Sequence, residues 1–547
     1  MLRQRKPEAY ATERFTKSFY VIQMYLLQHS ILNSANLYPD NEAFRCGDKA
    51  LTYKELVEQS HQLAHLLTSL GVQRGDRVGI YLNRCLETAV AVYGILSAGA
   101  AFVPLAPYAP PSRTQFVIQD CGIKHLISNK NQEKNLKNTL TQNSDIKSII
   151  SPSGGGWGED FTALCANLNI PTFTQKNLQQ SPNTKPNIRI LEDDLAYIMY
   201  TSGTTGTPKG IMHTHRSGLA YAKLSADLYN VQPNDRFGNH AALHFDVATM
   251  GYFTVPLAGA TTVIVPDIHT KLPVSMSQLI EKERLTIWYS VTFALIQVLQ
   301  SGIMEQLDFS ALRWILYCGE PFPSKHLRAL MQRLPNTCFS NVYGPAEVNQ
   351  CTYYHVPKPP EVDETVPLGK IWNNTEMLIF DENDVPVKQG ETGELLIRSA
   401  TQMKGYWNQP DLTEKGVYRR QRIAGCEEIF YRTGDLVRMC EKGNLYFLGR
   451  KDRQVKVRGY RIELDEVEAT LTAHEAIESA AIFAVKNDDE AYINAVAVQK
   501  KDLEISDLKL YLSKRLPAYA VPSNIKFIDA IPRTTAGKVD YKILKNS

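Results

Sequence analysis

The stretch YTSGTTGTPKG, residues 200–210, is the most informative segment of the sequence. It directly follows the apolar run 195–199, which is typical of a buried strand. Its glycine and hydroxyl residues supply many backbone N–H and O–H donors, so the segment can wrap around polyphosphate oxygens. A solvated turn of the same composition remains the alternative. The order G-x-x-x-x-G-K-S/T is absent, which excludes a conventional P-loop ATPase.

Composition and charge restrict the class of protein. The 547 residues predict roughly three to four structural units. Hydrophobic residues make up 44% and charged residues 21% of the chain, an ordinary globular composition that excludes disorder. The formal net charge of +3 predicts no nucleic-acid partner and no membrane partner. Nine scattered cysteines without a C-x-x-C pair favour a reducing cytoplasmic location over a disulfide framework or a zinc site.

Apolar periodicity predicts how the chain is organised. Helix-like and strand-like segments alternate up to about residue 105 and again from 191 to about 360, and a β-rich stretch follows to about 450. Residues 13–35 do not predict a membrane span, because no window there reaches ~18 consecutive apolar residues. They predict an amphipathic surface helix instead. Residues 151–190, rich in Ser, Gly, Asn, Gln and Pro, predict a surface excursion. The C-terminal region predicts a small α+β module, with helices at 464–474 and 506–515 and strands at 477–486 and 491–499.

Several further strings accompany the 200–210 stretch in a fixed order. They are LTYKEL at 51–56, LSAGAAFVP at 96–104, FD at 245–246, NVYGPAE at 341–347, YRTGDL at 431–436, GRKDRQVKVRG at 449–459, LPAY at 516–519 and AGKVD at 536–540. Together the strings resemble those of the adenylate-forming enzymes, which comprise acyl-CoA synthetases, luciferases and the amino-acid adenylation domains of nonribosomal peptide synthesis. The resemblance extends over nearly the whole chain.

The resemblance implies an α/β fold in two domains. A large N-terminal adenylation core, 1–451, would combine layered α/β subdomains with a β-rich subdomain and hold the ATP and substrate sites. A small mobile α+β lid, 452–547, would carry the catalytic lysine. Asp452 would be the hinge, and rotation about it would bring the loop around Gly459 to the tunnel through which a thiol reaches the site.

Roles in nucleotide chemistry follow from the same resemblance. Lys538 would be the catalytic residue, bridging carboxylate and α-phosphate oxygens during adenylate formation. Glu347 would ligate Mg²⁺, which suits a hard carboxylate beside phosphate. Tyr343 would stack on adenine, and Asp435 would accept hydrogen bonds from the ribose. The implied ATP-binding residues are Thr201, Ser202, Gly203, Thr204, Thr205, Gly206, Lys209, Gly319, Glu320, Asn341, Tyr343, Gly344, Asp435 and Arg450.

One position departs from the family pattern. Ala346 stands where the family usually has threonine, so one hydroxyl contact to the α-phosphate is missing. We expect Thr201, Thr204 and Thr205 to take over that contact. The departure affects neither the fold nor the class of enzyme that the resemblance implies.

Asp246 directs the choice of substrate. Amino-acid-activating members hold the α-ammonium group with a carboxylate at this position, because an unpaired charge in a closed pocket is costly. A turn or helix-capping aspartate is the alternative. The implied pocket is otherwise uncharged apart from Lys538, which disfavours acidic and basic substrates and is similar to pockets of freestanding prolyl-adenylating enzymes. Its residues are Asp246, Val247, Met250, Tyr289, Leu316, Cys318, Val342, Gln350 and Cys351, closed by Lys538.

L-Proline is therefore the first-choice substrate, and another small neutral amino acid is the alternative. The sequence shows no carrier-protein serine motif and no condensation motif, so we expect a separate phosphopantetheinylated carrier protein as acceptor. An acyl- or aryl-CoA ligase that uses coenzyme A remains open within the class. A luciferase-like oxygenase is disfavoured by Asp246, and a non-catalytic nucleotide sensor by the presence of both Lys538 and Glu347.

Overall fold

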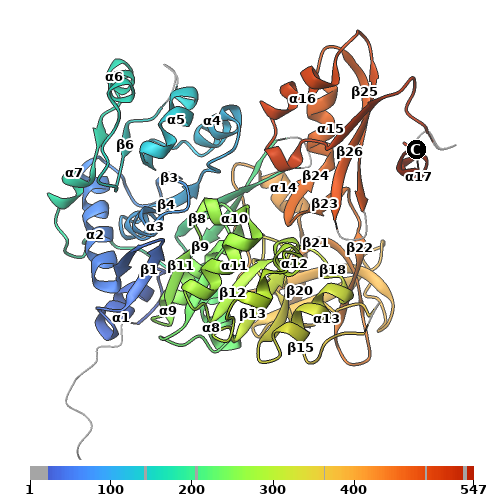
Figure 1. Ribbon diagram of the computed structural model, residues 1–547, viewed down its shortest axis with the longest axis horizontal. Helices are drawn as coiled ribbons and strands as arrows, with labels where there is room; N and C mark the ends of the chain where they lie inside the picture. The colour runs from blue at the N-terminus through green and yellow to red at the C-terminus, as the bar shows by residue number, and fades with distance from the viewer. Residues whose placement is uncertain are drawn as a thin grey trace, which may run out of the picture.

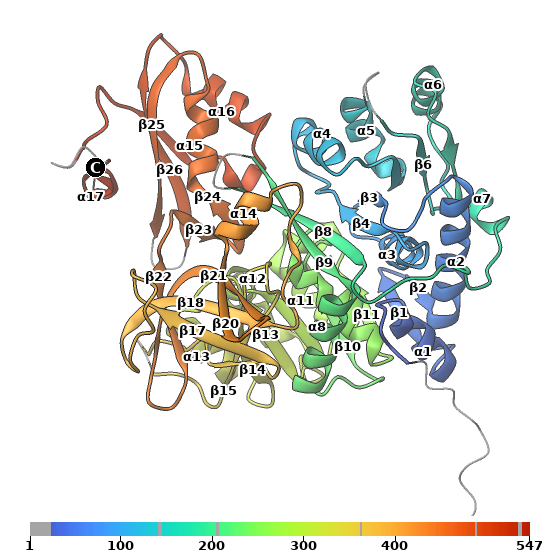
Figure 2. The same ribbon diagram turned by 180° about the vertical axis from the view of Figure 1, so that it is seen from behind.

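The computed structural model describes residues 23–140, 145–203, 207–361, 364–486, 490–533 and 539–546. Its architecture is mixed α/β, with a large N-terminal domain and a small C-terminal domain (Figure 1). The small domain lies near α4 (Pro111–Asp120) on one side and near β22 (Leu445–Arg450) on the other, as the two opposite views show (Figures 1 and 2). Among the described residues, no helix combines the length and apolar character that a membrane span requires.

The first sheet of the large domain carries the 200–210 stretch. Its central strands are parallel and read as short continuous apolar runs, because helices cover both faces of the sheet. The stretch connects β8 to its antiparallel neighbour β9. The sheet order is β19 (Gly405–Tyr406), β9 (Lys209–Thr214), β8 (Leu195–Thr201), β4 (Ala101–Pro104), β3 (Arg77–Tyr81), β5 (His125–Ser128), β6 (Ser148–Ile150) and β7 (Thr172–Phe173).

The second sheet carries four residues of the predicted substrate pocket, Tyr289, Leu316, Cys318 and Val342. It is parallel from β1 to β14 along its centre and ends in antiparallel strands on both edges. Its order is β16 (Lys370–Ile371), β15 (Thr352–Val356), β14 (Cys338–Tyr343), β13 (Trp314–Cys318), β12 (Ile287–Val291), β10 (Arg236–Asn239), β11 (Thr261–Ile264), β1 (Glu42–Cys46) and β2 (Lys49–Thr52).

Helices α2 (Tyr53–Ser69) and α3 (Glu87–Ser97) pack between these two sheets. Residues 88–97 of α3 are all buried, as expected for a helix that is apolar on every side. A capping box between Thr52 and Glu55 starts α2. Other helices cover the outer faces: α4, α5 (Glu133–Thr139) and α6 (Glu159–Asn167) on the first sheet, and α8 (His215–Leu228), α11 (Pro273–Lys282), α12 (Thr292–Gln300) and α13 (Ser324–Arg333) on the second.

A third, antiparallel sheet completes the large domain, and the small domain follows it. Asp452 lies between β22, the last strand of this sheet region, and β23, the first strand of the small domain. The third sheet comprises β17 (Thr375–Phe380), β18 (Thr392–Ser399), β21 (Cys426–Met439) and β20 (Val417–Ile423), with β22 paired to β21. The small domain comprises β23 (Gln454–Val457), β24 (Tyr460–Glu463), α15 (Leu464–Thr472), β25 (Ile477–Lys486), β26 (Ala491–Gln499), α16 (Ile505–Ser513), β27 (Asn524–Phe527) and α17 (Tyr541–Asn546).

Two sequence predictions about local structure are corrected. Of the surface helix predicted over 13–35, residues 13–22 lie outside the described residues. Helix α1 spans His29–Leu37, so the prediction is wrong for residues 23–28. Leu26 and Leu27 are buried, and the Leu27 N–H donates to Nδ1 of His215 rather than to a helical carbonyl. Residues 151–190 are not a simple surface excursion, because they contribute the edge strand β7, the helix α6 and the short helix α7 (Gln175–Gln179).

Candidate active site

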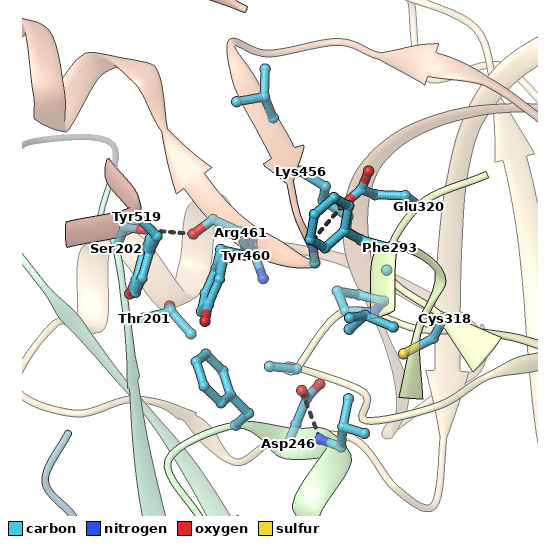
Figure 3. A pocket seen from close by; sticks show the side chains of 18 of the residues that line it. Thr201, Ser202, Asp246, Phe293, Cys318, Glu320, Lys456, Tyr460, Arg461 and Tyr519 are labelled. Carbon is cyan, nitrogen blue, oxygen red and sulfur yellow. Dashed lines mark hydrogen bonds between the residues drawn. The ribbon is translucent and has the colours of Figure 1, made fainter. Parts of the chain in front are cut away.

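A cavity of about 890 Å³ lies between the large and small domains. The ends of β8, β12, β13 and β14 border it, so the cavity occupies the carboxyl edges of parallel strands, where ligands bind in open α/β sheets. In Figure 3, Asp246 lies on one side of the cavity, and Tyr460, Arg461 and Tyr519 of the small domain lie across from it. Many predicted site residues line it: Thr201, Ser202, Asp246, Val247, Tyr289, Cys318, Gly319, Glu320, Asn341, Val342, Tyr343, Gly344, Gln350, Asp435, Arg450, Asp452 and Gly459.

The other predicted site residues lie elsewhere. Met250, Leu316 and Cys351 are fully buried in the hydrophobic core and do not line the cavity. The remaining residues that do not line it are Gly203, Lys209 and Glu347. Four predicted residues, Thr204, Thr205, Gly206 and Lys538, lie outside the described residues.

A chain of hydrogen bonds joins the predicted adenine and ribose residues to the predicted hinge. The Tyr343 hydroxyl donates to Oδ2 of Asp435, and Arg450 donates to Oδ1 of Asp435 at 2.6 Å. Nε and NH2 of Arg450 also donate to the two carboxylate oxygens of Asp452, each at 2.6 Å. The guanidinium of Arg450 thus joins the candidate ribose acceptor to the predicted hinge residue. The carboxylate of Asp435 retains acceptor capacity for a further donor.

Glu347 lies at the centre of a buried ionic cluster. Its side chain is fully buried, with Oε1 3.3 Å from Nζ of Lys209 and accepting from the Tyr406 hydroxyl at 2.8 Å. Oε2 accepts from NH1 of Arg461 at 2.8 Å. Burial alone would raise the pKa of Glu347, but the cations of Arg461 and Lys209 hold that pKa well below its usual range.

This arrangement does not fit a magnesium ion at Glu347. Both carboxylate oxygens are engaged, and two cationic side chains already share the single negative charge. A magnesium ion at Glu347 would need a free carboxylate oxygen as a ligand, and a guanidinium in the same place would repel the ion. The predicted metal site is therefore closed while Arg461 occupies it.

Asp246 presents a carboxylate to the cavity. It begins a short 3₁₀ turn, Asp246–Ala248, and its Oδ1 accepts from the Val247 N–H at 2.9 Å. No ion pair to Asp246 forms within the described part of the chain. Burial raises its pKa above that of an ordinary aspartate. An ammonium group in the cavity would supply the missing opposite charge.

One part of the cavity wall, formed by Tyr289, Cys318 and Gln350, is neutral. Nε2 of Gln350 donates to the Tyr289 hydroxyl, and burial raises the pKa of the Cys318 thiol to about 11, so this thiol stays protonated at neutral pH. Two donors near the other end of the cavity, Thr201 Oγ1 and Arg461 Nε, are buried without a partner among the described residues. Buried donors of this kind favour an oxyanion ligand.

Sequence reasoning missed three contributors from the small domain and one from strand β19 of the first sheet. Lys456, Tyr460 and Arg461 line the cavity, and Tyr406 contacts Glu347. The signal for Arg461 was its position two residues after Gly459, in the loop that the resemblance assigns to the thiol tunnel. Nothing local in the sequence indicates Tyr406, which reaches Glu347 through the pairing of β19 with β9.

Comparison with known proteins defines the family. Residues 31–407 match the AMP-binding enzyme family, and residues 466–538 match the AMP-binding enzyme C-terminal domain. The chain belongs to the AMP-binding enzyme family. The fold class predicted from the sequence and the resemblance to adenylate-forming enzymes are both confirmed.

Two relatives and one solved structure illustrate the similarity. The chain is 32% identical over 521 residues to an L-proline–L-prolyl-carrier protein ligase of Pseudomonas fluorescens, which covers 94% of this chain and 98% of the relative. It is 31% identical over 512 residues to a ligase of the same name from Streptomyces coelicolor, covering 91% and 92%. The Vibrio cholerae adenylation domain AlmE, solved with glycyl-adenosine-5′-phosphate, superposes with a TM-score of 0.82 at 24% identity over 98% of this chain and 99% of that structure.

Proposed function

We propose that the protein uses ATP to activate an amino acid, forming an aminoacyl-AMP and releasing pyrophosphate. It then transfers the aminoacyl group to the phosphopantetheine thiol of a separate carrier protein. L-Proline is the proposed amino acid. Lys538 is the proposed catalytic residue, and ATP with magnesium the proposed cosubstrate.

The carboxylate of Asp246, which has no ion-pair partner among the described residues, carries this proposal. A carboxylate in a largely enclosed cavity costs free energy unless an opposite charge pairs with it. The α-ammonium of an amino acid supplies that charge, whereas an aryl or fatty acid leaves Asp246 without a partner. The two prolyl-carrier relatives support an amino acid, and in particular proline, as the substrate.

The position of Gly459 supports a second, thiol-dependent step. Its N–H donates to the carboxylate of Glu320, and its Cα lies 3.5 Å from the point where a Cβ on Gly319 would stand. The loop around Gly459 therefore borders the cavity directly. This is the placement expected of a loop that helps to form a passage for a thiol.

Amino-acid-dependent exchange between ATP and labelled pyrophosphate tests the first step. We expect the strongest exchange with L-proline among all twenty amino acids, and no exchange with salicylate or a fatty acid. Exchange that is strongest with another neutral amino acid would keep the chemistry and replace the substrate. Exchange with none of the amino acids would reject the proposed function.

The acceptor is tested separately, with the purified enzyme and labelled proline. A phosphopantetheinylated carrier protein should become labelled through a thioester that hydroxylamine cleaves, and the unmodified carrier should not. Formation of prolyl-coenzyme A at a higher rate than loading of any carrier would identify coenzyme A as the acceptor instead.

A further inference from the structure

Gln350 carries a buried polar atom that no side chain in the described part of the protein satisfies. The residue is 4% exposed and borders the cavity. Its Nε2 donates to the Tyr289 hydroxyl, whereas its Oε1 is buried and has no hydrogen-bond partner among the described residues. A buried acceptor without a donor costs free energy, so this oxygen favours a ligand that brings a hydrogen-bond donor.

The neighbouring side chains do not supply that donor. The Tyr289 hydroxyl has a single hydrogen, and it is a hydrogen-bond neighbour of the Cys318 thiol as well as of Gln350. A half-turn of the Gln350 amide only exchanges its two polar atoms. Tyr289 then donates to Oε1, and Nε2 is the group left over. In both arrangements one polar atom of the amide remains for a ligand.

Gln350 shares its part of the cavity with Asp246. Both line the cavity together with Tyr289 and Cys318, and Figure 3 shows Asp246 and Cys318 bordering the same space. Burial chiefly raises the pKa of Tyr289 and of Cys318, and the negative charge of Asp246 adds to both shifts. Asp246 is therefore within electrostatic reach of the side chains that surround the Gln350 amide. One small ligand can contact Asp246 with its ammonium group and the amide with another group.

We propose that the amide of Gln350 selects an L-proline that carries a hydroxyl group on C4 of its ring. The inference rests on the proposed function, in that the substrate is a proline whose nitrogen pairs with Asp246. C4 is the ring atom that lies two bonds from both the nitrogen and Cα, so a substituent there is farthest from the reacting carboxylate and the ammonium group. A hydroxyl group both donates and accepts, so it satisfies whichever atom of the amide is free. The CH₂ group of unsubstituted proline satisfies neither.

Pyrophosphate exchange with the full-length protein tests this selection. The substrates are L-proline, the two epimers of 4-hydroxy-L-proline and, for each epimer, the 4-methyl-L-proline with its substituent on the same face of the ring. We expect kcat/KM for one hydroxy epimer to exceed that for L-proline and for its methyl counterpart about 10-fold, the effect of one net hydrogen bond. Hydroxyl and methyl groups fill nearly the same space, so their comparison isolates the hydrogen bond.

Variants assign the preference to the amide. Gln350→Met keeps a side chain of similar length without polar hydrogen-bonding groups, and it should lose most of the preference for hydroxyl over methyl. Gln350→Glu keeps acceptor oxygens in the same place and should retain the preference. Val342→Ala is the matched control, because Val342 also lines the cavity but has an apolar side chain. It should change the rates with both compounds and leave their ratio close to that of the parent protein.

Each result bears on the inference. It is overturned, and the proposed function is left intact, if the parent protein prefers L-proline or the methyl compounds. Equal kcat/KM for a hydroxy epimer and its methyl counterpart overturns it too, since water then satisfies the amide. So does an unchanged preference in Gln350→Met, shown to be folded by circular dichroism. Should that variant not fold, the parental comparison of hydroxyl with methyl decides. Exchange with none of these compounds and with no encoded amino acid would instead reject the proposed function itself.

Discussion

The hydroxyl of Tyr343, at the end of β14, donates a hydrogen bond to the carboxylate of Asp435 on β21. The two residues belong to different sheets and are both buried. Arg450 holds the other oxygen of Asp435. The ring proposed to stack on adenine and the carboxylate proposed to accept the ribose are therefore fixed to each other before a nucleotide arrives, which reduces the ordering needed on binding.

This relationship predicts unequal effects of two substitutions on ATP use. Asp435→Ala removes a charged acceptor, and loss of a hydrogen bond to a charged group costs about 1.5–3 kcal/mol, so the KM for ATP should rise roughly 10- to 100-fold. Tyr343→Phe keeps both the ring and the carboxylate and should raise KM much less. Pyrophosphate exchange at varied ATP concentration measures both. A larger effect for Tyr343→Phe would argue against Asp435 as the ribose acceptor.

The raised pKa of Asp246 predicts a pH dependence of amino-acid binding. Because burial raises this pKa, the carboxylate takes up a proton at a higher pH than an ordinary aspartate does. The KM for the amino acid should therefore rise as the pH falls toward that raised pKa, while the KM for ATP stays nearly constant. Initial rates between pH 8 and about 5 measure this dependence.

Asp246→Asn supplies the control for that dependence. The variant lacks the negative charge at every pH, and loss of a buried charged partner costs about 2–5 kcal/mol. Its KM for the amino acid should be at least roughly 30-fold higher at pH 7 and should not rise further as the pH falls. A pH profile parallel to that of the parent protein would show that another group is responsible.

Lys538→Ala tests the proposed catalytic residue. Loss of a charge placed for the transition state reduces kcat on the order of 10²–10³-fold, so adenylate formation should fall by that factor while nucleotide binding is nearly unchanged. Lys542→Ala is the matched control, since Lys542 is exposed on α17. Near-normal turnover of the Lys538 variant would remove the assignment.

Asp452→Pro tests the proposed hinge. Proline fixes φ and restricts the residue before it, so rotation between the domains should be hindered. Pyrophosphate exchange should be largely retained and aminoacyl transfer slowed. The carboxylate of Asp452 also accepts two hydrogen bonds from Arg450, so Asp452→Ala serves as the control that removes these bonds without fixing the backbone. Equal losses in the two half-reactions would contradict a hinge at this position.

The sequence predicted those parts of the fold that depend on local pattern. The strands at 477–486 and 491–499 have the predicted bounds, because short apolar runs between turn residues specify buried strands. The helix predicted over 13–35 was wrong for residues 23–28. Leu26 and Leu27 in this segment are buried, and a distant histidine, His215, accepts a hydrogen bond from the Leu27 N–H.

Site residues that belong to recognisable motifs were predictable from the sequence. Residues that reach the site through long-range contacts were less predictable. Met250 and Leu316 occupy pocket positions implied by the resemblance but lie in the core, since matching a sequence position does not fix how far its side chain reaches into the cavity. The meeting of Lys209, Glu347 and Arg461 depends on the placement of one domain against the other. No periodicity within any one segment encodes such a placement.

Gly459→Ala tests whether the domain arrangement described here serves the second half-reaction. Gly459 has φ of +81°, and a Cβ at this position would stand 2.6 Å from Cγ1 of Val291, closer than such atoms approach. The variant can relieve the contact only by moving its loop away from the cavity, because left-handed backbone is also unfavourable for alanine. Pyrophosphate exchange should change by less than about threefold, whereas transfer to the carrier thiol should fall about 10²-fold, since a misplacement of 1 Å can cost that much.

Val291→Ala combined with Gly459→Ala should recover part of the transfer rate by opening space for the methyl group. If Gly459→Ala transfers the aminoacyl group at the parental rate, the loop is not in its working position in this arrangement.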